Sequence, residues 1–140
     1  MVSIVTYTGD GSTTDYSIPF PYLDREHVVV ELDDVVTSNF SFLSDTSIRL
    51  SSAPAAQTRI VVKRSTPVAP LVDFTDGSTL FEADLDLADQ QSRYLGEEAR
   101  DRSDSALTTI NNNLADVNTV AGIASDVSTV AAVDNDVTTV

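Results

Sequence analysis

The residue types that most often carry acid–base or metal chemistry are few in this chain and poorly arranged for it. There is one histidine, His27, and no cysteine, so a zinc site or a Cys–His pair would lack its second imidazole or its thiolate. A Ser–His–Asp site needs a histidine held between a serine and a carboxylate, whereas His27 opens an apolar run typical of a β-strand. We therefore interpret His27 as a structural polar residue at a strand edge.

The carboxylates give no better site. Asp73, Asp76 and Asp84 carry suitable oxygens for a hard cation, but their spacing lacks the Gly and Glu register of a calcium loop. Glu97 and Glu98 are adjacent on a predicted helix and cannot face each other as an acid–base pair, so we interpret them as part of a solvated helix face. We predict no catalytic, cofactor-binding or metal-binding residues, and no enzymatic activity.

The first half of the chain consists of short β-branched or aromatic runs separated by turn residues. This pattern predicts six strands, within residues 2–8, 16–20, 27–32, 40–42, 48–50 and 59–64. Pro19 restricts the second strand to a sheet edge or a bulge. Strands this short and this closely spaced favour a small antiparallel sandwich-like or barrel-like body. Its core is small enough that we expect help from the following helix or from neighbouring copies.

A helix is predicted after the last strand. Asp76-Gly77 predicts a turn, and Thr79, three residues before Glu82, predicts a capping box and hence a helix start at about Thr79. Residues at alternating steps of four and three, which is heptad spacing, are Phe81, Leu85, Ala88, Ser92, Leu95, Ala99, Arg102 and Ala106. We expect this face to meet other helices, and an ordinary amphipathic helix packed on its own domain remains the alternative.

A ten-residue repeat follows from Leu114 onward, in which Val117, Val127 and Val137 correspond, as do Val120, Val130 and Val140. On a straight α-helix ten residues would leave the apolar stripe about 80° out of register at each repeat. Only a left-handed, overwound supercoil would keep it facing one axis. Because Val, Thr, Asn and Asp are mediocre helix formers, we expect this segment to be helical when bundled, and disorder in the monomer is the alternative.

The charge of the chain excludes several partners. Eight Lys and Arg against 22 Asp and Glu give a net charge of −14, which disfavours nucleic acids and anionic membrane surfaces. The chain has neither a signal-peptide pattern at its start nor an apolar run long enough to span a bilayer. No Lys or Arg follows Arg102, so a helix there lacks i,i+4 ion pairs and must be stabilised by packing.

Several blocks of sequence carry a family resemblance: VTYTGDGSTTDYSIPFPYL, HVVVEL, LVDFTDGS (Leu71–Ser78), ADLDLADQQ and GEEARD (Gly96–Asp101). Together they resemble the N-terminal domain of T7-like podovirus tail fibre proteins, in which a β-rich head precedes a trimeric helical shaft. The resemblance covers about Val5 to Asp101. The repeat from Leu114 is instead similar in composition to fibres of marine phages.

From the residues and this resemblance we predict an α+β fold, with a small antiparallel β-sandwich-like head followed by a long helix that forms a trimeric coiled-coil shaft. We assign residues 1–78 to a β-rich tail-attachment head, 79–110 to a coiled-coil helix and 111–140 to a decad-repeat shaft segment. The predicted trimer seam consists of Leu85, Ala88, Leu95, Ala99, Ala106, Ile110, Leu114, Val117, Val120, Val127, Val130 and Val137.

The resemblance implies a structural virion protein located in the phage tail, where it anchors a fibre to the tail adaptor and nozzle proteins. The implied partners are two further copies of the chain and these tail proteins. Because host recognition in this family lies at the distal end of the fibre, we expect the chain to be the base of a longer one. Candidate tail contacts, for each of which core packing is the alternative, are Phe20, Pro21, Tyr22, Phe74 and Phe81.

A second class of function is a glycan-binding or glycan-cleaving β module on a trimeric stalk. Binding would need exposed aromatic platforms, and cleavage would need two carboxylates across a cleft. The chain has four Tyr, five Phe and no Trp, and we expect the core to take most of these aromatics.

Overall fold

The computed structural model describes residues 2–75, 77 and 79–138, and it describes side chains as far as residue 132. The chain forms two compact units, Met1–Asp101 and Arg102–Val140. The elements, in chain order, are β1 (Ile4–Thr8), β2 (Asp15–Ser17), the 3₁₀ turn η1 (Arg25–His27), β3 (Val28–Leu32), β4 (Val35–Thr37), β5 (Phe40–Ser44), β6 (Ser47–Leu50), β7 (Arg59–Arg64) and α1 (Glu82–Thr138). The boundary between the units falls inside α1.

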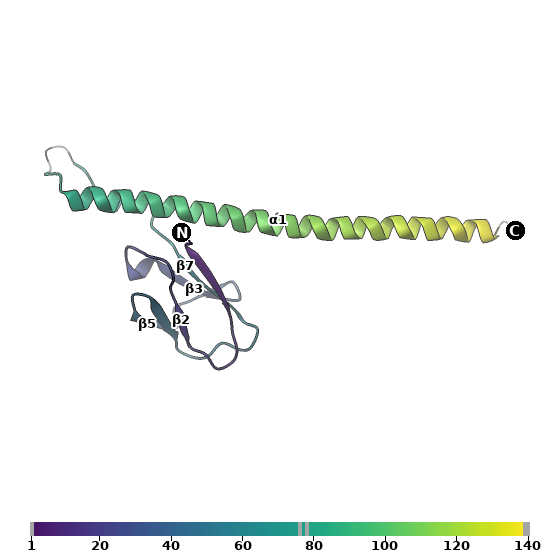
Figure 1. Cartoon of the computed structure of the whole chain (residues 1–140), viewed down its shortest axis with the longest axis horizontal. Coiled ribbons are helices and arrows are strands. Elements are labelled where there is room, and N and C mark those ends of the chain that lie inside the picture. Colours follow the sequence, from purple (N-terminus) through teal and green to yellow (C-terminus); the bar gives the residue numbers. More distant parts are fainter. Residues whose placement is uncertain (1, 76, 78, 139–140) are drawn as a thin grey trace. The chain divides into compact units, whose positions relative to one another are not determined.

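The strands form two antiparallel sheets, with the orders β1-β7-β3-β4 and β2-β6-β5 (Figure 1). β7 lies in the middle of the first sheet, where Val62 pairs with Val5 of β1 and with Val30 of β3. Its run Ile60-Val61-Val62 is buried throughout, as expected for β-branched residues in a central strand. β2 ends at Ser17, before Pro19, and lies at an edge of the second sheet, as the proline required.

One apolar core lies between the two sheets. The first sheet contributes Val28, Val30, Ile60 and Val62, and the second contributes Tyr16, Ile48 and Leu50. Each fully buried aliphatic side chain of this kind stabilises the fold by about 1.5–3 kcal/mol relative to its exposed state. The predicted sandwich-like arrangement of antiparallel strands is therefore observed.

A close backbone contact holds the turn after β1. The Gly9 N–H donates to the Thr58 carbonyl at 2.8 Å, and a Cβ on Gly9 would lie 2.4 Å from the Ala55 carbonyl oxygen. No residue other than glycine fits there without a backbone shift. The Asp10 carboxylate then accepts the backbone N–H groups of Ser12 and Thr13 at 2.8 and 2.7 Å, and with the Thr13 hydroxyl these bonds hold the pKa of Asp10 far below its usual range.

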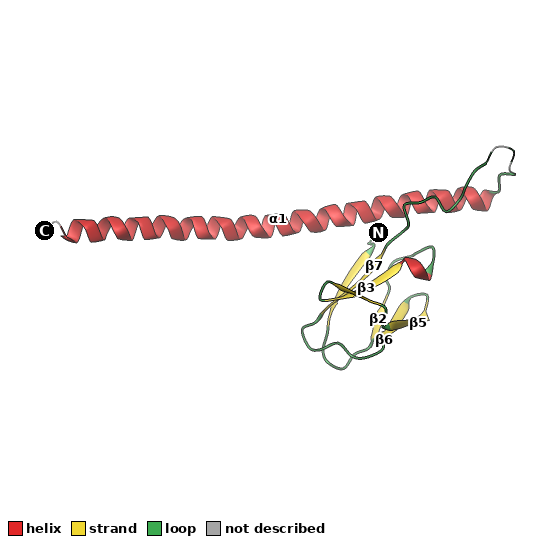
Figure 2. Cartoon of the chain, turned by 180° about the vertical axis from the view of Figure 1, so that it is seen from behind, coloured by secondary structure: helices red, strands yellow, loops and turns green. Residues whose placement is uncertain are grey.

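The segment after β7 runs alongside the first turns of α1 (Figure 2). The Gln91 side chain holds it there, donating to the Pro67 and Ala69 carbonyls at 2.6 and 2.8 Å and accepting from the Leu71 N–H at 3.0 Å. α1 then continues to Thr138, so the ten-residue repeats are helical as far as the described residues extend. No helix among those residues is long and apolar enough to cross a membrane.

Some expectations about element boundaries were wrong. The strand expected within 16–20 ends at Ser17, and His27 closes η1 rather than opening β3. Residues Val35–Thr37 form β4. This strand was not expected, because it is only three residues long and follows Asp33-Asp34 directly. α1 begins at Glu82 rather than at about Thr79. Glu82 is therefore the first helical residue and cannot occupy the third position that a capping box requires; Asp76 lies outside the described residues.

Candidate functional site

The residues considered for chemistry do not form a site in the part of the chain that the structure describes. No group of three or more His, Cys, Asp or Glu residues there could hold a metal ion. His27 contributes its backbone carbonyl, which accepts the Ser65 N–H at 2.7 Å, while its buried Nδ1 has no hydrogen-bond partner among the described atoms. Asp73 is exposed in the segment before α1 and belongs to no group of metal-binding side chains among the described residues.

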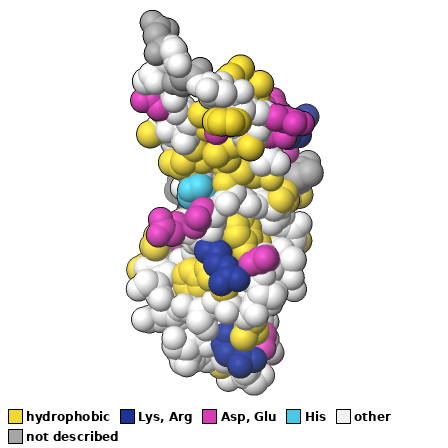
Figure 3. Space-filling model, turned by 90° about the vertical axis from the view of Figure 1, so that its left-hand side faces the viewer, with side chains coloured by type: hydrophobic (Ala, Val, Ile, Leu, Met, Phe, Trp, Pro, Cys, Tyr) yellow, Lys and Arg dark blue, Asp and Glu magenta, His cyan; other side chains and the backbone are white. Residues whose placement is uncertain are grey.

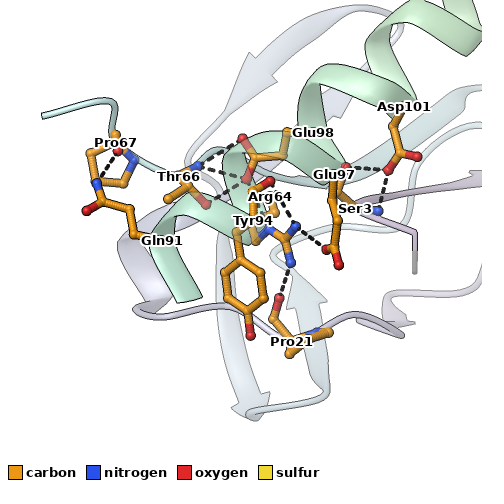
Figure 4. A network of polar contacts seen from close by, with 10 residues as sticks. All are labelled: Ser3, Pro21, Arg64, Thr66, Pro67, Gln91, Tyr94, Glu97, Glu98 and Asp101. Atoms are coloured by element: carbon orange, nitrogen blue, oxygen red, sulfur yellow. Dashed lines mark hydrogen bonds and ion pairs between the residues drawn. The ribbon is translucent and has the colours of Figure 1, made fainter. Parts of the chain in front are cut away.

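A buried polar cluster instead joins the head to α1. At its centre is Arg64, the last residue of β7, which is 3% exposed. Its Nε donates to Glu98 Oε1 at 2.9 Å, and its two terminal nitrogens donate to Glu97 Oε2 and to the Pro21 carbonyl, both at 2.8 Å (Figure 4). The guanidinium also lies 3.8 Å from the ring centroid of Tyr94, a cation–π geometry.

Glu98 is a corrected prediction, because it does not lie on a solvated helix face. It is 4% exposed, and besides Arg64 it accepts the Thr66 hydroxyl at 2.6 Å and the Thr66 N–H at 3.1 Å. Glu97 is half-buried against Arg64. A carboxylate buried this deeply is tolerated because it is paired with a cation and hydrogen-bonded by further donors.

A second contact ties the start of the chain to α1. The Asp101 carboxylate accepts the Ser3 hydroxyl at 2.5 Å and the Ser3 N–H at 2.6 Å, and Ser3 is fully buried. These hydrogen bonds hold the pKa of Asp101 below its usual range. We call Ser3, Arg64, Thr66, Gln91, Tyr94, Glu97, Glu98 and Asp101 the polar clamp.

The polar clamp and the predicted seam occupy different faces of α1. Residues Leu87, Gln91, Tyr94, Glu98 and Asp101, which are buried or half-buried, recur at steps of four and three and so line one face. At about 100° per residue this face lies roughly 100° around the helix from the predicted seam. α1 therefore packs on its own head, which was the alternative interpretation, and does so mainly through a face other than the one predicted to meet other copies.

The predicted seam is largely open to solvent in the single chain. Ala88 and Leu95 are half-buried and Ala99 and Ala106 are exposed. The large members, each about half exposed or more, are Leu85, Ile110, Leu114, Val117, Val120, Val127 and Val130. The Val137 side chain lies outside the described ones. Exposed apolar side chains that recur along so much of a helix are typical of a surface that another protein covers.

The five candidate tail contacts fall into two groups. Phe20 is 3% exposed and belongs to the core, so core packing, the alternative to a tail contact, holds for it. Tyr22 is half-buried against the same core, while Pro21 is exposed. Phe74 and Phe81 are 52% and 62% exposed. The structure thus separates Phe20 and Tyr22, which pack inward, from Pro21, Phe74 and Phe81, which face solvent.

Comparison with known proteins gives these features a family. Residues 1–116 match the family described as phage T7 tail fibre protein, N-terminal domain. The chain belongs to this family. The predicted resemblance is confirmed, and this tail fibre domain is accordingly a structural component of the virion tail.

The relatives of this tail fibre domain carry several names. The tail fiber protein of Escherichia phage T7 is 39% identical over 81% of this chain and 22% of its own length. A capsule KN4-specific depolymerase of Klebsiella phage KN4-1 is 40% identical over 64% of the chain and 12% of its own, and the anchor protein of Klebsiella phage KP34 is 34% identical over 61% and 28%. The chain spans about a fifth of the length of the T7 fibre it matches.

The sequence blocks that suggested the family contain much of the polar clamp. GEEARD supplies Glu97, Glu98 and Asp101, and ADLDLADQQ supplies Gln91. Their role was missed because Glu, Asp and Gln side chains are mostly exposed in proteins. Their position on the helix could have revealed this role, because Gln91 and Glu98 lie on the same face as Leu87 and Tyr94, at steps of four and three.

Proposed function

We propose that this tail fibre domain is the base of a fibre, with a head that attaches the fibre to the phage tail and a helix that assembles it as a homotrimer. The family match over residues 1–116 carries this proposal. Proteins named as a tail fiber, a depolymerase and an anchor share this region over only 12–28% of their lengths. A region common to proteins with such different names fits a shared mounting role better than recognition of any one host.

The exposed seam supports self-association. α1 is 57 residues long. Helices in proteins are stabilised mostly by the packing of an apolar face against other elements. Beyond Asp101 the apolar residues Ile110, Leu114 and Val120 are 53–65% exposed. Burying this row against two further copies would supply the missing packing, and the number three follows from the family resemblance. We assign residues 79–110 to the coiled-coil part of this shaft and 111–140 to its decad-repeat part.

The β-rich residues 1–78 would then bind the tail. By family resemblance the partners are the adaptor and nozzle proteins of the tail. The buried polar clamp supports this division of labour, because it fixes the head to the start of α1 and so transmits force between the two.

The alternative, a glycan-binding or glycan-cleaving β module, finds less support. Six aromatic residues of the head pack in or against the core, namely Tyr7, Tyr16, Tyr22, Phe20, Phe40 and Phe42. They are needed for folding and are poorly placed to stack on a sugar. Depolymerases named for different capsule types share this region over a small part of their length, which supports a role common to them over recognition of one capsule.

Binding of the 140-residue chain to phage particles assembled without this protein tests the proposal. We expect saturable binding that blocks later incorporation of the full-length fibre, and no saturable binding to capsular glycans. Failure to bind the particles, together with saturable glycan binding, would contradict attachment and favour the glycan-binding module.

A further inference from the structure

A group of exposed apolar side chains lies directly before α1. These are Leu71, Phe74, Leu80 and Phe81, which are 40%, 52%, 58% and 62% exposed; we call them the proximal patch. Figure 3 looks at the end of the head unit where α1 begins and shows hydrophobic side chains gathered on that face. Single exposed apolar residues need no explanation, but four within one short segment mark an interaction surface.

The proximal patch is distinct from the helix seam. All four residues precede Glu82, the first residue of α1, so they lie outside the helical turns that carry the predicted seam. Phe81, with which the heptad spacing was expected to begin, lies directly before the first helical residue. One edge of the patch is fixed, because the Leu71 N–H is held by Gln91 of the polar clamp. The patch and the β-rich head belong to the same compact unit, Met1–Asp101, to which the proposed function assigns attachment.

The charges around the proximal patch specify the chemistry of its partner. Asp73, Glu82 and Asp86 flank it and are exposed, and the chain contains no Lys or Arg between Arg64 and Arg93. A partner that covers the patch must offer an apolar hollow, and basic residues around that hollow would complement the acidic rim.

We propose that the proximal patch is the surface by which this chain docks on the tail, inserting Phe74 and Phe81 into an apolar hollow edged by Lys or Arg. This inference rests on the proposed attachment function and specifies its contact surface and partner. Aromatic residues that enter a desolvated pocket contribute most of the affinity of an interface. The acidic rim adds an attraction that weakens as salt concentration rises.

The test uses the double variant Phe74→Ser, Phe81→Ser of the whole chain, with particles assembled without this protein as the binding probe. Val35→Ser, Val36→Ser is the matched control, because these two valines are 68% and 65% exposed on the edge strand β4. We expect the patch variant to bind at least about tenfold more weakly, the control to bind like the unchanged chain, and added salt to weaken binding of both the unchanged chain and the control.

Each outcome has a separate meaning. If the unchanged chain does not bind the particles, the proposed function fails. If the unchanged chain and the patch variant bind equally, attachment stands and this inference is overturned. If the patch variant instead loses oligomer mass in light scattering, the patch is covered by a second copy and the tail contact lies elsewhere, which also overturns the inference.

Discussion

Arg64 Nε lies 2.9 Å from Glu98 Oε1, with the arginine side chain fully removed from solvent and the glutamate side chain 4% exposed. This pair joins Arg64, the last residue of the central strand β7, to Glu98 of α1, about three helical turns beyond Leu87. Two charges are buried here because the remaining donors and acceptors are also satisfied, by Thr66, Glu97 and the Pro21 carbonyl. Removing Arg64 leaves the Glu98 carboxylate as an uncompensated charge in the interior.

We therefore expect Arg64→Met to destabilise the head unit by about 3–5 kcal/mol, because Glu98 loses its buried cation. Urea unfolding followed by circular dichroism measures this. Arg49→Met is the matched control: Arg49 pairs with Asp15 at 2.6 Å, but its side chain is 53% exposed, so the cost should stay below about 1 kcal/mol. Equal losses in the two variants would contradict the buried role of Arg64.

The Ser3–Asp101 contact predicts a dependence on acid. The pKa of Asp101 is lowered in the folded chain, chiefly by the Ser3 hydroxyl. Its contribution to stability is therefore complete above the unfolded pKa, about 3.9, and is lost as pH falls below that value. We expect Asp101→Asn to lower stability at pH 7 and to reduce the further loss between pH 4 and pH 2, measured by urea midpoints.

Asp10 and Asp15, whose pKa values are also lowered, remain in the Asp101→Asn variant, so some acid dependence should persist. Asp104→Asn, on an exposed helix position, serves as the control and should behave like the unchanged chain. A pH profile for Asp101→Asn that parallels the unchanged chain would show that Ser3 and Asp101 do not stabilise the folded state.

Gly9→Ala should lower the melting temperature of the head. The added Cβ would lie 2.4 Å from the Ala55 carbonyl oxygen, a backbone atom that cannot move without disturbing the turn. Gly122→Ala is the control, since its added Cβ would meet nothing within 4 Å beyond the adjoining backbone of its own helix and alanine favours a helix over glycine. Unchanged melting of Gly9→Ala would mean that the approach of residues 54–56 to Gly9 is looser in solution.

The seam predicts which surface of α1 holds copies together. Leu95→Asp with Ala99→Asp places two charges on this surface, so we expect dissociation to monomers while the head stays folded. Thr108→Asp with Asn111→Asp adds the same charge on a different face and should leave the assembly intact. Unchanged mass in the first variant, measured by light scattering, would show that the seam lies on another face.

The patterns that repeat over several residues predicted the fold well. Period-two alternation located most strands, because each strand buries one face against a common core; Ile48 and Leu50 around Arg49 are an example. The continuous apolar run Ile60–Val62 likewise predicted a strand, and the structure places it in the middle of the first sheet. The helix and its continuation through the repeats followed from heptad and decad spacing.

The features that were missed depend on contacts between distant residues. The burial of Glu98 depends on Arg64 and Thr66, more than 30 positions away in the chain, and no local pattern distinguishes it from a solvated glutamate. Ser3 is likewise buried where it contacts two distant residues, since its carbonyl accepts the Arg64 N–H and its hydroxyl donates to Asp101. Likewise Phe20 and Phe74 are chemically alike in sequence, and only the packing of the two sheets makes one a core residue and leaves the other exposed.

The central claim, that α1 assembles this tail fibre domain from three copies, is tested most directly by light scattering of the purified 140-residue chain at micromolar concentration. The chain has a mass of 15.0 kDa. The trimer predicts three times this value, about 45 kDa by the closed symmetry of such assemblies, whereas a mass of 15.0 kDa with α1 intact by circular dichroism would contradict it.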